Sequence, residues 1–335
     1  MAKVKAAPQA PKAAQPKGPL LKLLVLTALM TFIVIVLGAA TRVADAGLSC
    51  PDWPTCYGQW FPFPAPEGGY HAEGITYTLT QVLLEWTHRL TASLTGFLLL
   101  ASLFFAYKFR SENKRVFRVG LFALLALLTQ VKMGGITVWL DNINWSVALH
   151  LGNAMIFYSL LIAMISAAVR PANVTPIKAA LRTKLLMVLA YVMVFFTMLA
   201  GAMVSTTHAG GVCGGLFDCV GSWWPADDVA QQIHMIHRYM VALTIFTLLA
   251  LRIEARREHP ALNKTAKVAE AFIIVQIALG ILTLYSFSHY ANFYQFLSVA
   301  HLAWGTVLLT VVLTGCLKLL WGEKDPTIKI MPGHP

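Results

Sequence analysis

Long apolar stretches separated by short polar connections dominate this chain. A helix needs roughly 20 consecutive apolar residues to cross a bilayer, and the sequence contains eight such runs. An even number of spans returns the chain to its starting side, so both termini are expected on one side of a membrane. The runs cover residues 20–42, 79–108, 117–139, 146–169, 185–206, 230–251, 268–288 and 295–320.

The composition agrees with membrane insertion. Of 335 residues, 57% are hydrophobic and only 12% are charged, which is too apolar for an ordinary soluble domain. Outside the spans, Lys and Arg occur in the terminal segments and in alternate connections, while the connections on the other side contain none. Since Lys and Arg are retained in the cytoplasm during insertion, both termini are predicted to be cytoplasmic.

The basic residues and the N-terminal segment narrow the class of protein further. The net charge of +11 is spread over five short membrane-flanking segments and forms no single patch, so no nucleic-acid partner is expected. The first 18 residues are rich in Ala, Pro and Lys and lack an apolar core, unlike a cleaved signal or transit sequence. We expect a multi-pass protein of the bacterial plasma (inner) membrane.

The chain contains an internal duplication. Gly38 matches Gly201, and His88-Arg89 matches His237-Arg238 after a shorter second loop. Likewise "TQVKMGGITV" at 129–138 matches "VQIALGILTL" at 275–284. Four spans per unit make the two units run the same way through the membrane, related by an axis near the membrane normal. The predicted fold is an all-α integral membrane protein of two tandem four-helix bundles.

The duplication also sets the expected domain bounds. They are a disordered cytoplasmic tail over 1–18, an N-terminal bundle over 19–170, a cytoplasmic linker over 171–184, a C-terminal bundle over 185–322 and a cytoplasmic tail over 323–335.

Four histidines recur at one depth, on the second and fourth helix of each unit. His88, His150, His237 and His301 are predicted roughly 7–15 Å below the outer surface, at 1.5 Å per residue, in the outer half of the bilayer. Two facing helices that each contribute one imidazole make a slot for a flat metallocycle with axial ligands on both faces. The alternative is that each histidine is a core residue whose ring is hydrogen-bonded to a neighbour. Because the same histidine pattern occurs in both units, two cofactor pockets are favoured, one with His88 and His150 and one with His237 and His301.

Three basic residues lie near these pockets. Arg89 and Arg238 each follow a candidate ligand directly, where a guanidinium can bond an anionic arm such as a heme propionate. The alternative is that both side chains extend to the outer interface. Lys132, in the outer half of its span, is a candidate partner for a propionate or for Glu85.

Glu85 marks a difference between the two units. It lies three residues before His88 on the same helix face, and its equivalent in the second unit is His234. A carboxylate beside a cofactor can move protons or stabilise developing positive charge. The alternative is a simple ion pair with Arg89. The difference favours one pocket for chemistry and another for a permanent redox centre.

Four of the five cysteines form two matched pairs in the outward loops. Cys50 with Cys56 and Cys213 with Cys219 can close short disulfide loops on the oxidising side of the membrane. A structural and a redox role both stay open for either pair.

These motifs together resemble the heme A synthase family. "EWTHRL" (85–90), "ALHLGNA" (148–154), "IHMIHRYM" (233–240) and "VAHLAWG" (299–305) lie on the even helices, and the resemblance extends over about residues 20–320. It implies oxidation of the position-8 methyl group of heme O to the formyl group of heme A, for the biogenesis of heme-copper oxidases. It also implies a bound heme b.

Carried over by motif, the resemblance assigns residues to the two hemes. Glu85, His88 and His150 are expected at the substrate heme, and His237 and His301 as axial ligands of heme b; a contribution of His234 stays open. The implied partners are heme O and the lipid bilayer. Heme O synthase, a quinol or thiol electron donor and a second copy of the chain are further candidate partners.

Two other functions are alternatives to heme oxidation. A diheme b-type electron-transfer cytochrome, linked to quinol, would use the same histidines without chemistry on its own heme. A transporter built from parallel repeats would need helices broken by Gly or Pro at the midplane, whereas the histidine helices read as continuous.

Overall fold

The computed structural model describes residues 18–170 and 176–322, and most of them are helical. Within these residues, eight helices are long and apolar enough to cross a membrane, which confirms the predicted membrane fold. A short hairpin of β1 (His71–Ala72) and β2 (Ile75–Thr76) and a 3-10 turn, η1 (Ala209–Gly211), lie between them. The helices are α1 (Gly18–Val43), α2 (Leu79–Lys108), α3 (Lys114–Trp139), α4 (Asn144–Val169), α5 (Leu181–Thr206), α6 (Val229–Glu258), α7 (Pro260–His289) and α8 (Ala291–Trp321).

Local sequence signals fix where several helices begin. The Thr78 side chain accepts a hydrogen bond from the backbone N–H of Gln81, whose side chain accepts one from the backbone N–H of Thr78. Asn113 and Asp228 cap α3 and α6 in the same way with side-chain oxygens. These caps satisfy backbone N–H groups that a helix leaves free at its start. They set the start of α2 and α6, which carry candidate ligands.

The helices α6 and α7 extend past their predicted bounds. The sequence predicted a connection between residues 251 and 268, whereas α6 continues to Glu258 and α7 starts at Pro260. Only His259 separates them, and its Nδ1 accepts a hydrogen bond from the backbone N–H of Ala261 at 3.1 Å. Hydropathy marks only the apolar part of a helix, and charged residues can continue it into water.

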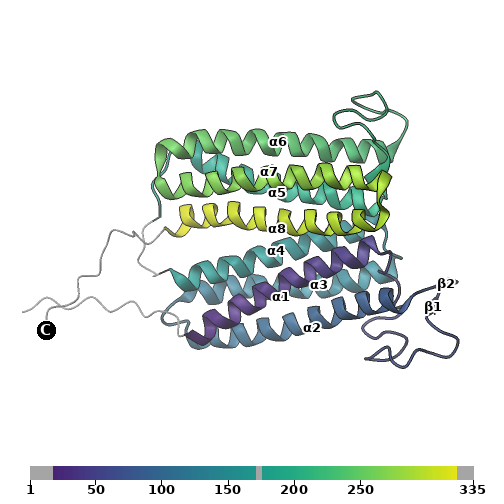
Figure 1. Ribbon diagram of the computed structural model, residues 1–335. Helices are drawn as coiled ribbons and strands as arrows, with labels where there is room; N and C mark the ends of the chain where they lie inside the picture. The colour runs from purple at the N-terminus through teal and green to yellow at the C-terminus, as the bar shows by residue number, and fades with distance from the viewer. Residues whose placement is uncertain (1–17, 171–175, 323–335) are drawn as a thin grey trace, which may run out of the picture.

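Each half of the chain forms a ring of four helices (Figure 1). In the first half α1 and α3 each contact both α2 and α4. Within the described residues, α2 and α4 have no close backbone contact, so they lie on a diagonal of the ring. The second half repeats this pattern, with α6 and α8 on the diagonal. The histidine-bearing helices therefore face each other across each ring.

The two rings meet through α1 and α4 on one side and α5 and α8 on the other. At one end of this contact, Arg42 donates hydrogen bonds to the backbone oxygens of Ser205 (2.9 Å) and Thr206 (3.1 Å). At the other end, Arg170 donates to the backbone oxygen of Gly322 at 2.8 Å. Polar side chains thus tie the halves together at both ends of the helices.

The outer surface of the rings is apolar. Phe97, Phe122 and Phe246 are each about two-thirds exposed, at 68%, 64% and 69%. Large exposed hydrophobic surface is rare in soluble monomers and is expected where lipid covers a protein. The exposed aromatic side chains therefore fit the membrane environment that the eight spans predict.

The series of described helices begins with α1 and ends with α8 at the same end of the molecule (Figure 1). The first turn of α1 and the last turn of α8 lie there, beside the Lys- and Arg-rich connections. The predicted tails over 1–18 and 323–335 lie outside the described residues except for Gly18, as does the 171–175 part of the predicted linker. The cytoplasmic side and the bounds of the two bundles stay predictions.

Candidate functional site

His88 and His237 are held in the same way in the two rings. His88 Nδ1 donates a hydrogen bond to the backbone oxygen of Val34 at 3.0 Å, and His237 Nδ1 donates to that of Thr197 at 3.1 Å. A carbonyl oxygen only accepts, so Nδ1 carries the proton in both residues. The lone pair of Nε2 is then available to a metal ion.

A glycine lies against each of these imidazoles. A Cβ atom added at Gly38 would lie 3.0 Å from Cε1 of His88, and one at Gly201 would lie 3.1 Å from Cε1 of His237. Both distances are shorter than ordinary carbon contacts. The absence of a side chain at Gly38 and Gly201 therefore makes room for the rings.

His150 and His301 contact a glutamine and a glycine on the preceding helix. Gln130 Nε2 lies 3.2 Å from Nε2 of His150, and Gln276 Nε2 lies 3.2 Å from Nε2 of His301. A Cβ atom added at Gly280 would lie 3.1 Å from Cε1 of His301. Gly134 has the corresponding position beside His150, and a Cβ atom added there would lie 3.5 Å from Cε1 of that histidine.

The four histidines form two pairs across the diagonals. His88 and His150 lie close enough to interact electrostatically, and so do His237 and His301. All four lie within about the first three turns of helices that start from the same end. Each ring therefore brings together two partly buried imidazoles from facing helices, and such a pair can hold a planar metal complex.

Glu85 is buried, 4% exposed, and fully engaged in hydrogen bonds. Its Oε2 accepts from the backbone N–H of Cys50 (2.8 Å) and from Ser49 Oγ (3.0 Å), and its Oε1 pairs with Arg89. The carboxylate thus joins α2 to the loop that carries the first cysteine pair. At the equivalent position, His234 donates from Nδ1 to the backbone oxygen of Ala209 at 2.7 Å.

Arg89 and Arg238 point into the loops that carry the two cysteine pairs. Arg89 donates to the backbone oxygens of Cys50 (3.0 Å), Asp52 (2.5 Å) and Thr55 (2.7 Å). Arg238 donates to the backbone oxygens of Cys213 (3.1 Å) and Asp218 (2.9 Å). Both arginines thus attach a cysteine loop to a histidine-bearing helix. Their contact with a propionate stays a prediction.

Both predicted disulfides are present. Cys50 is bonded to Cys56 and Cys213 to Cys219, with Cα–Cα distances of 4.6 and 4.5 Å. Each second cysteine begins a tight turn of two residues with positive φ, Tyr57-Gly58 (55° and 72°) and Val220-Gly221 (52° and 79°). Two left-handed residues are typical of a type I′ turn. The same turn thus closes both disulfide loops.

Asp52 and Asp218 support these turns by accepting hydrogen bonds from the backbone N–H groups of Gly58 (3.0 Å) and Gly221 (2.8 Å). Burial alone would raise the pKa of Asp52. Hydrogen bonds from Thr55 and from the backbone of Gly58 outweigh it and lower the pKa below its ordinary value. Asp52 therefore stays ionised near neutral pH and holds the loop.

The sequence analysis assigned no function to several residues that contact the histidines. The duplication aligned Gln130 with Gln276 and Gly134 with Gly280, but gave no reason for either pair. Their position one turn apart on one helix face was the available signal. Lys132 on α3 is exposed, and its predicted pairing with a propionate or with Glu85 stays a prediction.

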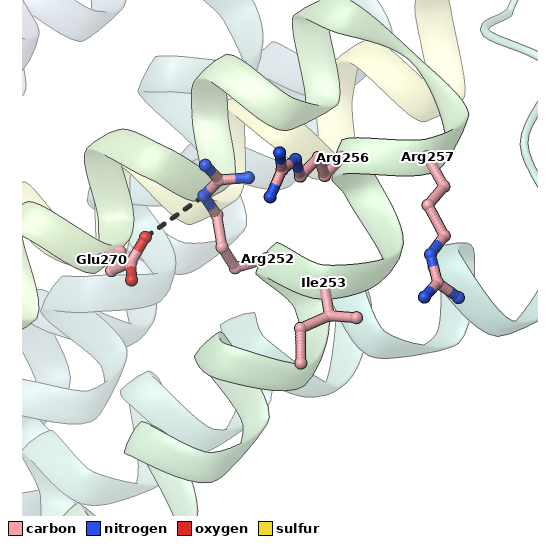
Figure 2. A pocket seen from close by; sticks show the side chains of 5 residues that line it. All are labelled: Arg252, Ile253, Arg256, Arg257 and Glu270. Atoms are coloured by element: carbon pink, nitrogen blue, oxygen red, sulfur yellow. Dashed lines mark hydrogen bonds and ion pairs between the residues drawn. The ribbon is translucent and has the colours of Figure 1, made fainter.

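A pocket of about 500 Å³ lies far from the histidines (Figure 2). It is lined by Arg252, Ile253, Arg256, Arg257 and Glu270. Arg252 pairs with Glu270 at 3.2 Å, and the group lies at the opposite end of α6 from His237. The lining thus belongs to the basic end of the molecule, while the partly buried imidazole pairs form the candidate site.

Comparison with known proteins agrees with this site. The family model described as cytochrome oxidase assembly protein (COX15-CtaA) matches residues 21–313. The heme A synthase of Shewanella oneidensis is 27% identical, covering 92% of this chain and 98% of the relative. That of Exiguobacterium sibiricum is 29% identical, covering 77% and 84%, and that of Halalkalibacterium halodurans is 24% identical, covering 76% and 84%.

The family match includes all eight spans and the four histidines, and the relatives align over most of their own length. The chain therefore belongs to the COX15-CtaA family of cytochrome oxidase assembly proteins.

Proposed function

We propose that this protein is a heme A synthase, an oxidoreductase that converts heme O to heme A for heme-copper oxidase biogenesis. The observation that carries the proposal is the pair of partly buried imidazoles on facing helices in each ring, in a family whose relatives bear that name. The reaction consists of two successive hydroxylations of the position-8 methyl group of heme O; each removes two electrons from that carbon, which an external oxidant such as O2 would accept, and the resulting hydrated aldehyde loses water to give the formyl group.

The donor set fits a heme in each ring. His88 and His237 have Nδ1 engaged with a carbonyl oxygen, which leaves Nε2 as the ligand atom and fixes the orientation of the ring. In the second ring, Nδ1 of His301 is buried and has no hydrogen-bond partner among the described residues. Neutral imidazoles in apolar surroundings are suitable axial ligands for heme iron.

The two rings have different roles in this proposal. His88 and His150 bind the iron of heme O in the first ring, and His237 and His301 bind heme b in the second. A bound heme b supplies one-electron redox chemistry beside the substrate site. The difference between Glu85 and His234 supports this division, because only the first ring has a buried carboxylate on the ligand helix.

Glu85 is the proposed catalytic group in the first ring. Its carboxylate handles protons or stabilises positive charge as the methyl group is oxidised. Arg89 and Lys132 are proposed contacts for the propionates of heme O, and Arg238 for those of heme b. Arg89 and Arg238 would add a propionate to the loop carbonyls that they already bind.

The cellular setting follows from the same proposal. The protein spans the bacterial plasma membrane with both termini in the cytoplasm and the histidines in the outer half of the bilayer. The disulfides then lie on the oxidising side, where such bonds persist. Heme O synthase and a quinol or thiol electron donor are the proposed partners.

Pigment analysis tests this function against an electron-transfer cytochrome. The protein is expressed in a host that makes heme O but no heme A, and the extracted hemes are identified by absorption and mass. We expect heme A to appear only when the protein is present, together with heme b in the purified protein. Two stably bound b hemes and no heme A in any extract would establish the cytochrome instead.

Gly38→Ala tests the fit of the first ring. The added methyl group would lie 3.0 Å from Cε1 of His88, so the imidazole must move away from its position. Overpacking costs about 1–3 kcal/mol, and we expect heme binding in the first ring to weaken accordingly. The measurement is a titration of the apoprotein with hemin, followed by absorption.

Gly96→Ala, on the helix that carries His88, is the matched control, since its Cβ would meet only Cδ2 of Leu127 on α3, at 3.8 Å. Both changes add a methyl group to a membrane helix. Equal hemin affinity of the two variants would contradict the placement of His88 as a ligand.

A further inference from the structure

The pocket at the basic end of the molecule is lined by α6 and α7, and three of its five lining residues are arginines (Figure 2). Arg252 is held by two acceptors on α7, Asn263 Oδ1 at 2.5 Å and Glu270 Oε2 at 3.2 Å. Arg256 and Arg257 have no hydrogen-bond or ion-pair partner among the described residues. Arg256 lies one helical turn from Arg252, so two guanidinium groups share one face of α6.

The other carboxylates of these two helices face α5 and do not line the pocket. The acidic residues of α6 and α7 are Glu254, Glu258 and Glu270. Glu254 pairs with Arg182 on α5 at 3.3 Å, and Glu258 accepts a hydrogen bond from the backbone N–H of Ala180 at 3.1 Å. The pocket therefore has an excess of positive charge, and its arginines can bind an anionic ligand.

An exposed apolar strip leads from the pocket toward the middle of the spans. The helices α6 and α7 run antiparallel, and the contact of Arg252 with Glu270 fixes their register. One turn further toward the middle, Leu249 and Ile274 are 42% and 62% exposed, and Phe246 follows on α6 at 69%. Such a strip is expected to contact acyl chains, while arginines at the end of a span lie at the depth of lipid headgroups.

Different residues occupy the corresponding place in the first ring. The match of His88 with His237 aligns the three arginines with Leu103, Tyr107 and Lys108. Leu103 is buried, and Nζ of Lys108 lies 4.4 Å from the centroid of the Phe104 ring. Both halves carry basic residues that set their orientation in the membrane, so insertion alone does not account for an arginine-lined pocket in the second ring.

We propose that this pocket binds the headgroup of an anionic phospholipid, with Arg256 and Arg257 bonded to the phosphate and an acyl chain along the apolar strip. A guanidinium can donate two parallel hydrogen bonds to phosphate oxygens. Basic pockets between membrane helices on the cytoplasmic side are suited to such headgroups, and the basic end is the side predicted to be cytoplasmic. The inference stands apart from the proposed function, because no heme takes part in it.

The test measures lipid binding to the full-length protein in a neutral detergent. Short-chain phosphatidylglycerol and the matching phosphatidylcholine are titrated separately, and bound lipid is counted by native mass spectrometry. We expect the wild type to bind phosphatidylglycerol more tightly by about fivefold or more, the effect of one net charge at a basic surface. Inorganic phosphate is titrated as a third ligand. Phosphate that binds as tightly as phosphatidylglycerol would indicate a site for a soluble anion and overturn the proposal.

Arg256→Gln combined with Arg257→Gln should weaken phosphatidylglycerol binding by roughly 25-fold, about fivefold for each charge. Neither side chain has a partner among the described residues, so the thermal unfolding midpoint without lipid should stay unchanged. Lys108→Gln combined with Arg110→Gln is the matched control. It removes two positive charges at the same end of the first ring, where both side chains lie over aromatic rings, and should bind lipid as the wild type does.

Three results would overturn the inference. They are equal phosphatidylglycerol affinity of the Arg256 and Arg257 double variant and the wild type, equal affinity of the wild type for the two lipids, and an equal loss of affinity in the control variant. The last result would reveal a general response to net charge. A protein that shows the expected lipid affinities but makes no heme A would leave the inference standing and defeat only the proposed function.

Discussion

His88→Ala and His150→Ala should abolish heme A formation while leaving the heme b absorption intact, and His237→Ala and His301→Ala should remove the heme b absorption. Each imidazole is partly buried in its own ring and is paired with one partner across the diagonal. Loss of a residue that merely orients a metal ligand costs about 10–100-fold in affinity or activity. Loss of the ligand itself should therefore exceed roughly 100-fold.

The measurement combines the reduced absorption spectrum of each purified variant with the heme A content of the cells that express it. His71→Ala serves as the control, because His71 is exposed in the β1–β2 hairpin and contacts Gly68 and Thr76. Free imidazole added to the alanine variants should restore part of the heme binding. Simultaneous loss of both hemes from every variant, with the protein still folded, would contradict two independent pockets.

Glu85→Gln should lower heme A formation by about 10²–10⁴-fold, the usual contribution of a group that handles protons, and should retain heme b. We expect the Glu85→Gln variant to keep its fold, because most hydrogen bonds around this position remain possible. A glutamine keeps one acceptor oxygen for Cys50 or Ser49, and Arg89 keeps its three backbone carbonyl partners. The rate of heme A formation and the thermal unfolding midpoint are both measured.

Two further variants separate chemistry from loop attachment. Glu270→Gln removes the carboxylate that pairs with Arg252 at the basic end of the spans, and we expect it to leave heme A formation unchanged. Arg89→Gln removes the bonds of Arg89 to the loop carbonyls and its ion pair with Glu85 but keeps the carboxylate. Equal losses of heme A formation in the two variants, with the hemin affinity of the first ring unchanged in both, would contradict a catalytic role for Glu85.

The spans could be predicted because a bilayer imposes a strict length and apolarity on each helix. The bounds of α2 agree at both ends, 79 and 108, where a capping box and a lysine mark the limits. The connection after residue 251 was predicted too long, because helix continuation in water depends on local capping by His259 and Pro260 and leaves no hydropathy signal.

The site was predictable in its residue types but not in its contacts. The duplication singled out the four histidines, and both predicted disulfides are present. The partners of Arg89 and Arg238 are backbone oxygens, which have no signature in the sequence. The glycines beside the imidazoles were visible as repeats, yet the need for them appears only when helices are placed side by side.

The glycine contacts also bear on how the protein is made. Each imidazole packs on the helix that comes immediately before its own in the chain, His88 on α1, His150 on α3, His237 on α5 and His301 on α7. Contacts between neighbouring segments form early, because little chain entropy is lost in closing them. We therefore expect each helical hairpin to orient its ligand during translation, so that a newly inserted chain is ready to receive heme once its rings close.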